Sequence, residues 1–356
     1  MAESGTTMGS RALVIAPNTI GDAVMVQPLL ALLCQQNPRL RLDVLCSDAV
    51  APVFRCMDEV GDVIDGPPPE GRTLWATRWR LGRALRARRY HAAYVLPDSR
   101  ISALVPWFAG IRQRVGYRGQ SRALLLNRIH EAPRARGPKT AERYAALAFE
   151  PHAPCPGSVT DPHLTRRTQR ERTVRAKFDI GREAPPIVLC TATGGGESHR
   201  WPARHFASLI AMLAAETPEA DVLLLGPATE RRAATEIAAL SGQAARNLCG
   251  ETTLDEAIAI VAQAAGVVTV DTGLMHVAAA YGRPQVALFG PSDPRRGQPR
   301  SPRAHVEWLH LACSPCAEQA CPLVHHACMQ RIAPTQVFEA LSRAMRFETT
   351  GARPAR

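Results

Sequence analysis

The chain has 356 residues, of which 46% are hydrophobic, 21% are charged and only 5% are aromatic. This composition excludes an intrinsically disordered chain, and the length suggests two domains. Lys and Arg total 43 against 32 Asp and Glu, so the net charge is +11 and an anionic partner is indicated: a nucleic acid, an anionic membrane surface or a phosphorylated small molecule. No zinc-finger, helix-turn-helix or RNA-binding motif stands out, so nucleic acid ranks last.

The N-terminal half alternates predicted strands with predicted helices. Short apolar runs predict strands over residues 11–16, 41–46, 60–64 and 92–97. Helices are predicted over residues 23–33 and over residues 74–89, and the second carries six arginines: Arg78, Arg80, Arg83, Arg86, Arg88 and Arg89. This alternation favours a parallel sheet with helices on both faces, and the scarcity of aromatic residues fits the same α/β class.

A proline-rich stretch between residues 151 and 162 separates this half from a second series of the same kind. Strands are predicted over residues 186–191, 221–225, 266–270 and 285–289, the last of which we expect to be the final strand. Helices are predicted over residues 166–178, 203–215, 230–240 and 334–346. We therefore expect one domain over residues 1–165, a second over 166–333, and a closing helix and tail over 334–356.

Ligands of open parallel sheets bind at the carboxyl ends of the strands, so loops that follow strands are candidate sites. One such segment, residues 271–276, reads DTGLMH and begins a predicted helix. Gly273 allows a ligand to approach the backbone, and Thr272 and the helix-start amides offer donors to a phosphate, with His276 in the same turn. The alternative is that Asp271 or Thr272 simply caps the helix.

A second loop, residues 191–200 (TATGGGESHR), also lies between a strand and a helix. Three consecutive glycines are costly unless the backbone approaches a ligand or moves. With Thr191 and Thr193 before the glycines and His199 and Arg200 after them, the loop resembles an anion-binding loop, and a mobile surface loop is the alternative. No Gly-Lys-Ser/Thr sequence follows the glycines, so an ATP-hydrolysing phosphate loop is disfavoured.

Asp22 follows Gly21 at the start of the first predicted helix. A carboxylate there could accept a proton from a sugar hydroxyl, although capping a helix is the more common role of such a residue. The sequence contains no Asp-x-Asp pair, so a paired-carboxylate magnesium site is unsupported. Arginine, histidine and helix dipoles would then have to meet the charge of a leaving phosphate.

The ten cysteines form two groups. Six are scattered among apolar residues and are expected to be small buried thiols: Cys34, Cys46, Cys56, Cys155, Cys190 and Cys249. The other four cluster near the C-terminus: Cys313, Cys316, Cys321 and Cys328. The cluster admits two interpretations, reduced thiols in a compact loop or a structural zinc site.

Four blocks make the sequence similar to glycosyltransferase family 9, the ADP-heptose:lipopolysaccharide heptosyltransferases: residues 12–30, 115–127, 190–202 and 268–292. The resemblance implies two facing Rossmann-like domains of the GT-B type with an interdomain cleft, and a donor nucleotide held mainly by the C-terminal domain. It also implies inverting, metal-independent transfer of heptose from ADP-heptose to the heptosylated inner core of lipopolysaccharide, with no cofactor required. A different core acceptor, or a non-catalytic nucleotide-sugar-binding protein on the same scaffold, remains an alternative.

The resemblance also assigns roles to residues. Asp22 matches the general base that deprotonates the acceptor hydroxyl. The donor-binding positions are Thr191, Thr193, Glu230, Asp271, Thr272, Gly273, Leu274 and His276. Where the family usually has a phosphate-binding lysine this chain has His199, followed by Arg200, and we expect Arg200 or protonated His199 to neutralise the ADP leaving group.

The implied acceptor is anionic and embedded in the inner leaflet. Arg118, Arg122 and the arginine-rich helix are therefore expected to bind the core and the membrane surface, each surface cation contributing about 1 kcal/mol, and a solvated helix face is the alternative. The longest uncharged apolar run, about residues 257–270, is shorter than the roughly 20 residues of a spanning helix, and the opening MAESGTTMGSR lacks the apolar core of a secretory signal. We therefore expect a cytoplasmic protein peripherally associated with the inner membrane.

Overall fold

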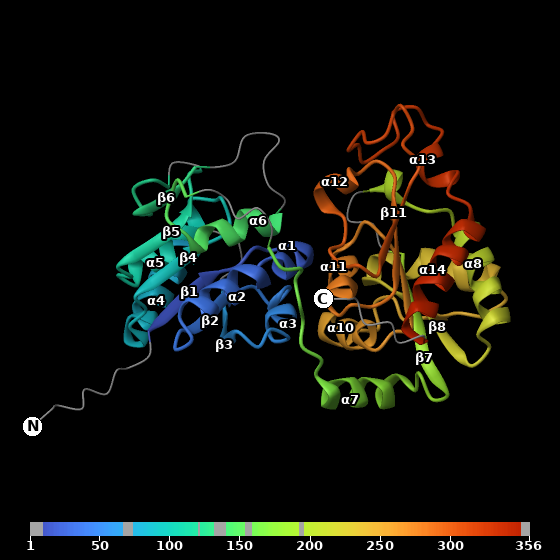
Figure 1. Cartoon of the computed structure of the whole chain (residues 1–356), viewed down its shortest axis with the longest axis horizontal. Coiled ribbons are helices and arrows are strands. Elements are labelled where there is room, and N and C mark those ends of the chain that lie inside the picture. Colours follow the sequence, from blue (N-terminus) through green and yellow to red (C-terminus); the bar gives the residue numbers. More distant parts are fainter. Residues whose placement is uncertain are drawn as a thin grey trace, which may run out of the picture. The chain divides into compact units, whose positions relative to one another are not determined.

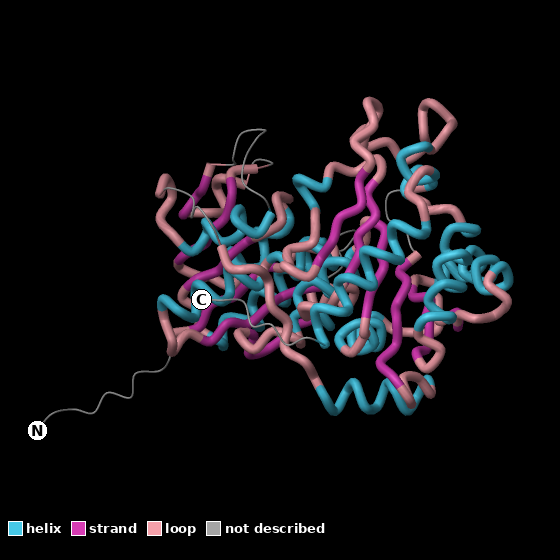
Figure 2. Tube along the Cα trace, turned by 45° about the vertical axis from the view of Figure 1, so that its right-hand side comes forward, coloured by secondary structure: helices cyan, strands magenta, loops and turns pink. Residues whose placement is uncertain are grey.

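The structure is a computed structural model that describes residues 10–66, 74–119, 122–131, 140–153, 159–191 and 196–349. The chain divides into two compact units, Met1–Pro162 and His163–Arg356. Each unit is built around one six-stranded sheet (Figure 1), and all the strand pairs are parallel. Helices border the strands of each sheet (Figure 2). The predicted α/β class with two Rossmann-like sheets is confirmed.

The first sheet has the strand order β3-β2-β1-β4-β5-β6. Its strands are β1 (Arg11–Ile15), β2 (Arg41–Cys46), β3 (Val60–Asp65), β4 (Ala92–Val95), β5 (Gln113–Tyr117) and β6 (Arg128–His130). The helices of this unit are α1 (Ile20–Met25), α2 (Gln27–Gln36), α3 (Ala51–Phe54), α4 (Leu74–Leu85), α5 (Leu104–Phe108) and α6 (Thr140–Ala145), with short 3-10 turns η1 (Arg86–Arg88), η2 (Ile101–Ala103) and η3 (Ala146–Ala148).

Alternation along β1 explains how this sheet is covered, because successive strand side chains point to opposite faces. Leu13 and Ile15 pack in one buried cluster with Leu85 of α4 and Val105 of α5. The intervening Val14 is also fully buried, so both faces of β1 are covered. The apolar runs that predicted these strands are long because a central parallel strand is buried on both sides.

A buried carboxylate connects three segments of the first unit. Asp43 in β2 is 1% exposed, and it accepts hydrogen bonds from the Tyr90 hydroxyl at 2.5 Å, from Arg11 Nη2 at 2.7 Å and from Arg88 Nη1 at 3.1 Å. Burial by itself raises the pKa of Asp43, but the hydrogen bonds from Tyr90 and Arg11 outweigh it, and the pKa lies below its ordinary value. The carboxylate therefore remains ionised inside the fold.

The second sheet has the strand order β12-β11-β10-β7-β8-β9. Its strands are β7 (Ala184–Cys190), β8 (Ala220–Leu225), β9 (Arg246–Asn247), β10 (Gly266–Val270), β11 (Gln285–Phe289) and β12 (Ala304–Trp308). The helices are α7 (Thr168–Phe178), α8 (Ala203–Glu216), α9 (Arg231–Leu240), α10 (Leu254–Ala262), α11 (Gly273–Ala280), α12 (Pro294–Gly297), α13 (Ala327–Gln330) and α14 (Pro334–Thr349), with 3-10 turns η4 (Glu197–His199) and η5 (Ala228–Glu230).

Helices cover both faces of this second sheet, with α8 and α14 on one side of the strands and α10 and α11 on the other (Figure 1). Val286 and Leu288 of β11 belong to the large core cluster that includes Leu341 of α14. The alternating residue Phe289 packs instead with Met275 of α11. Each face of β11 thus packs against one of the two helix layers. The contact with Phe289 fixes α11 beside the carboxyl end of β11.

Two of the sequence expectations about elements are wrong. Residues 285–289 are not the final strand, because β12 follows and pairs with β11. The helix predicted over residues 74–89 ends at Leu85, where a 3-10 turn takes over and Arg89 adopts a left-handed conformation with φ 52°. The sequence analysis also missed β5, β6 and β9. They are short or begin with arginine or glutamine, so they lack the apolar run that predicts a strand.

Within the described residues, no helix combines the length and the apolar character needed to cross a membrane.

Candidate active site

Loops that carry the predicted donor-binding residues leave the second sheet at one edge. β7 pairs with β10 so that Cys190 lies opposite Thr269, and with β8 so that Cys190 lies opposite Leu225. Neighbouring strands are about 4.8 Å apart, so the residues that follow them emerge close together. Thr191, which is buried, and Asp271, which is partly exposed, are the first residues beyond their strands. The predicted convergence of these two loops is therefore present.

The start of α11 lacks the side-chain cap that the sequence left as an alternative. Thr272 is the N-cap residue, with φ −138° and ψ 164°, but its side chain makes no capping hydrogen bond. Its hydroxyl oxygen is buried and forms no hydrogen bond with any residue that the structure describes. The partly exposed Gly273, Leu274 and His276 form the first turn of the helix. This hydroxyl and the first amides of α11 can therefore donate to an anion.

Arg200 and Glu230 form a bidentate ion pair in the second unit. Arg200 Nη1 and Nη2 each lie 2.8 Å from a carboxylate oxygen of Glu230. The Glu230 side chain is 7% exposed and that of Arg200 is 42% exposed. Separate ligand contacts were expected of these two residues, and their pairing was not predicted. Because a guanidinium has five N–H donors, Arg200 can contact a phosphate while Glu230 holds it.

His199 occupies a more enclosed position than Arg200. The His199 residue is 8% exposed, and its Nδ1 lies 3.2 Å from Ser198 Oγ. The Ser198 amide donates to the Gln319 carbonyl at 3.0 Å. Gly196 has φ 92°, and a Cβ at that position would lie 2.7 Å from the Gln319 carbonyl oxygen. Of the earlier residues in this loop, Thr193 lies outside the described residues, as do Gly194 and Gly195.

The cysteine-rich segment, residues 313–328, also contacts the loop that follows β11. Ser314 Oγ donates to the Gly290 carbonyl at 2.5 Å, and the Ala317 amide donates to the Pro291 carbonyl at 2.8 Å. A Cβ at Gly290 would lie 2.6 Å from Met329 Sδ. Together with the Ser198–Gln319 contact, these bonds show that the cysteine-rich segment fixes the loops after β7 and β11.

The thiols of this segment are not arranged as a metal site. Within the part of the chain that the structure describes, no three His, Cys, Asp or Glu side chains are placed so as to hold a metal ion. Cys313, Cys316, Cys321 and Cys328 are all free thiols. Burial raises the pKa of the Cys328 thiol, and the other three sulfurs raise it further. The zinc interpretation of the four cysteines therefore finds no support in their placement.

In the first unit, Asp22 lies in the first turn of α1, just beyond the carboxyl end of β1. The N-cap residue is Thr19, whose hydroxyl oxygen accepts the Asp22 amide at 3.2 Å and whose hydroxyl donates to Asp22 Oδ2 at 2.8 Å. The capping role that was the alternative for Asp22 therefore belongs to Thr19. The Asp22 charge also raises the pKa of Tyr144, secondary to the effect of burial. The carboxylate is partly exposed and oriented by one hydroxyl.

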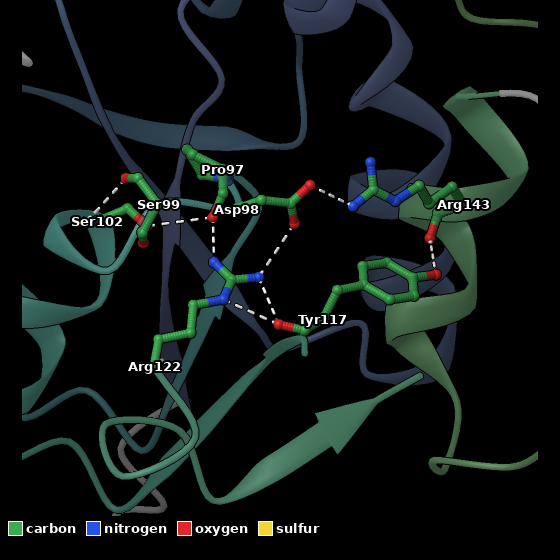
Figure 3. A network of polar contacts seen from close by, with 7 residues as sticks. All are labelled: Pro97, Asp98, Ser99, Ser102, Tyr117, Arg122 and Arg143. Atoms are coloured by element: carbon green, nitrogen blue, oxygen red, sulfur yellow. Dashed lines mark hydrogen bonds and ion pairs between the residues drawn. The ribbon is translucent and has the colours of Figure 1, made fainter. Parts of the chain in front are cut away.

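The two arginines predicted to bind the acceptor have different environments. The Arg118 side chain is 59% exposed, and its Nε lies 2.8 Å from Glu131 Oε1. The Arg122 side chain has no exposed surface, and its guanidinium donates to the Tyr117 carbonyl at 2.8 Å, to the Pro97 carbonyl and to Asp98 (Figure 3). Burial of this kind argues against the direct acceptor contact expected of Arg122. Its guanidinium instead joins the loop after β4 to the end of β5.

The same network contains two residues that the sequence analysis did not single out. Asp98 follows β4, the neighbour of β1, and its Oδ2 lies 2.6 Å from Arg143 Nη2. The Arg143 guanidinium lies 4.7 Å from the centre of the Tyr117 ring, and the Tyr117 hydroxyl donates to the Arg143 carbonyl at 2.5 Å (Figure 3). Asp98 is 49% exposed at the side chain. Its place directly after a strand was the signal that could have identified it.

The arginine-rich helix α4 presents tryptophans as well as arginines. Trp75 and Trp79 are 58% and 46% exposed, and Trp107 of α5 is 46% exposed. The Arg83 guanidinium lies 5.0 Å from the centre of the Trp79 ring. The exposed arginines of this region are Arg80, Arg83, Arg86 and Arg89, whereas Arg78 is buried and Arg88 pairs with Asp43 and Asp62. The sequence analysis identified the arginines but not the tryptophans.

Comparison with known proteins places this geometry in a family. A profile described as glycosyltransferase family 9 (heptosyltransferase) matches residues 78–327. Lipopolysaccharide heptosyltransferase 2 of Escherichia coli is 37% identical over 93% of this chain and 97% of its own length, and lipooligosaccharide heptosyltransferase 2 of Haemophilus influenzae is 37% identical over 83% and 87%. The solved structure of E. coli ADP-heptose lipopolysaccharide heptosyltransferase II superimposes with a TM-score of 0.83 at 35% identity, covering 95% of this chain and 99% of that one. The chain belongs to glycosyltransferase family 9, the heptosyltransferases, and is a glycosyltransferase.

Proposed function

We propose that this enzyme transfers L-glycero-D-manno-heptose from ADP-heptose to the heptosylated inner core of lipopolysaccharide. The observation that carries the proposal is the 37% identity to lipopolysaccharide heptosyltransferase 2 of E. coli over 93% of the chain. The proposal assigns donor binding to the unit of residues 163–356 and acceptor binding to the unit of residues 1–162. The strand-end loops of the second unit support the first assignment, because their threonines and helix-start amides suit a diphosphate.

In this proposal the donor diphosphate lies at the start of α11. The buried Thr272 hydroxyl and the first amides of α11 donate to the phosphate oxygens, and Thr191 lies at the same edge of the sheet. Arg200 rather than His199 meets the charge of the leaving ADP, because the Arg200 side chain is 42% exposed while the His199 residue is 8% exposed. Glu230 then orients Arg200, and its remaining lone pairs can accept a ribose hydroxyl.

Asp22 is the proposed general base. Its carboxylate takes the proton of the acceptor hydroxyl as that oxygen attacks the anomeric carbon of heptose. The bond from this carbon to the phosphate oxygen breaks, ADP leaves with the electron pair, and the configuration at the carbon inverts. The developing negative charge is met by Arg200 and the positive end of the α11 dipole, so the proposed reaction needs no divalent metal and no cofactor.

We further propose that α4 and α5 dock on the anionic surface of the inner membrane, where the acceptor resides. Trp75 and Trp107 flank Phe108, with ring centres 6.3 and 5.1 Å from it. Exposed arginines belong to the same segment, and the guanidinium of Arg83 lies over the Trp79 ring. Tryptophan is enriched at membrane interfaces, and arginine is attracted to anionic headgroups. Trp75→Ala/Trp79→Ala should lose co-sedimentation with phosphatidylglycerol vesicles, while a Leu240→Ala control, which alters an exposed apolar residue of the other unit, should not.

The enzymatic proposal is tested by incubating the purified protein with ADP-heptose and defined truncated cores in EDTA. Mass spectrometry should show one added heptose on the core that already carries heptose, and none on the core that lacks it. Transfer only to the core without heptose would replace the proposed acceptor. Binding of ADP-heptose without transfer to any core would favour a non-catalytic binding protein.

A further inference from the structure

A cavity of about 340 Å³ lies in the second unit, away from the candidate active site. Its walls include Pro185 at the beginning of β7, Ala264 and Ala265 just before β10, and Arg283 just before β11. These are the amino-terminal ends of the strands, whereas Thr191 lies at the carboxyl end of β7. A strand of five to seven residues is about 16–23 Å long, so the two sites are at opposite edges of the sheet.

The lining of this cavity is strongly basic. Four arginines line it, Arg166, Arg172, Arg175 and Arg283, against one acidic residue, Glu171. Glu171 is buried, and its carboxylate pairs with Arg166 through contacts of 3.1 and 2.5 Å, so it offsets only one positive charge.

Backbone carbonyls hold two of the other guanidinium groups. Arg175 Nη2 donates to the Gly181 carbonyl, and Arg283 Nε lies 3.3 Å from the Tyr281 carbonyl. A hydrogen bond to a carbonyl does not neutralise a guanidinium, so these two contacts leave Arg175 and Arg283 as cations in the lining of the cavity. Thr168, the first residue of α7, adds a hydroxyl and the positive end of an eleven-residue helix to the same lining.

We propose that this cavity binds a phosphorylated small molecule, with Arg172, Arg175 and Arg283 contacting the phosphate. A guanidinium group can donate two parallel hydrogen bonds to the oxygens of one phosphate. The proline and alanines of the wall carry no charge, so the arginines provide the recognition of the anion. The volume exceeds that of a single phosphate and lies at the lower end of the range for small-molecule sites, which suits a sugar phosphate or a diphosphate. The site is independent of the proposed transfer reaction, since it shares none of the residues assigned to that reaction.

The test is calorimetric titration of the full chain with inorganic pyrophosphate in the presence of saturating ADP, which occupies the proposed donor site. We expect one pyrophosphate per chain, and affinity at least tenfold weaker in Arg172→Ala and in Arg283→Ala. Arg172→Lys should recover part of the lost affinity, because lysine keeps the positive charge but cannot donate two parallel hydrogen bonds to one phosphate. Arg204→Ala, an exposed arginine of α8 outside the cavity, is the matched control and should bind as the native chain does.

The proposal is overturned if pyrophosphate does not bind under these conditions, or if Arg172→Ala and Arg283→Ala melt at the native temperature and bind pyrophosphate as tightly as the native chain does. Binding that Thr272→Val abolishes and Arg172→Ala does not would belong to the donor site and would also overturn it. Competition with lipid vesicles distinguishes a lipid headgroup from a soluble phosphorylated ligand. Vesicles with phosphatidic acid that compete with pyrophosphate indicate a lipid headgroup, and vesicles that do not compete indicate a soluble ligand.

Discussion

Asp43→Asn should destabilise the first unit substantially. Asparagine keeps one acceptor oxygen for four donors, the Asp62 amide among them, and removes the charge that faces Arg11 and Arg88. Removing one partner of a fully buried ion pair costs about 3–5 kcal/mol. The side chains of Arg11 and Arg88 are 27% and 36% exposed, so water compensates part of the loss and we expect about 2–3 kcal/mol. At about 2–4 °C per kcal/mol, the Tm of this unit should fall by roughly 4–12 °C in circular dichroism.

Asp62→Asn is the matched control, since Asp62 contacts the same two arginines but its side chain is 58% exposed. It should cost less than about 1 kcal/mol. The effect also depends on pH. The pKa of Asp43 is lowered in the fold, so its stabilisation is present above the unfolded-state pKa of about 4 and is lost as the pH falls through the native value. The Tm gap between native chain and Asp43→Asn should therefore be constant from neutral pH to about pH 5 and shrink below it. Equal Tm values for Asp43→Asn and Asp62→Asn would show that the buried carboxylate contributes no more to stability than the exposed one.

Two further predictions concern the donor site. Thr272→Val should weaken ADP-heptose binding about tenfold in calorimetry and leave Tm unchanged, because the buried hydroxyl makes no hydrogen bond with the described residues; a lower Tm would reveal a hidden cap instead. Gly196→Ala should raise the KM for ADP-heptose severalfold, because φ is 92° and the new Cβ would meet the Gln319 carbonyl. Gly297→Ala, whose Cβ would meet nothing within 4 Å, should be silent, and equal KM values for the two variants would contradict this account of the loop.

Much of the fold follows from the sequence because central parallel strands are buried on both faces. The runs around β1 and β10 are almost wholly apolar, and each is followed by a short loop and a helix that has a glycine in its first turn. The edge strands were harder to predict. β12 carries His305 and Glu307 among its five residues, and none of the five is fully buried, while β9 has only two residues. Neither contains an apolar run, and only pairing with a neighbour makes them strands.

The sequence predicted which residues belong to the candidate site, but not which of their side chains pair with one another. Strand-end loops identified Asp22, Thr191 and Asp271, because topology alone puts such loops at one edge of a sheet. The Arg200–Glu230 pair joins residues 30 positions apart, and no periodicity encodes that contact. Arg122 shows the opposite error. The charge of Arg122 suggested a place on the surface. The side chain is buried instead, because the carbonyl groups of Pro97 and Tyr117 accept its hydrogen bonds, and the sequence does not show that these groups lie together.

The proposed transfer depends above all on Asp22, which takes the proton of the acceptor hydroxyl. The most direct measurement compares kcat of the native chain, Asp22→Asn and an exposed control, Asp58→Asn, with ADP-heptose and the heptosylated core in EDTA, beside calorimetric affinity for ADP-heptose. We expect kcat to fall by about 10²–10⁴-fold in Asp22→Asn alone, with the affinity for ADP-heptose unchanged in all three proteins. Turnover by Asp22→Asn at the native rate would contradict this role.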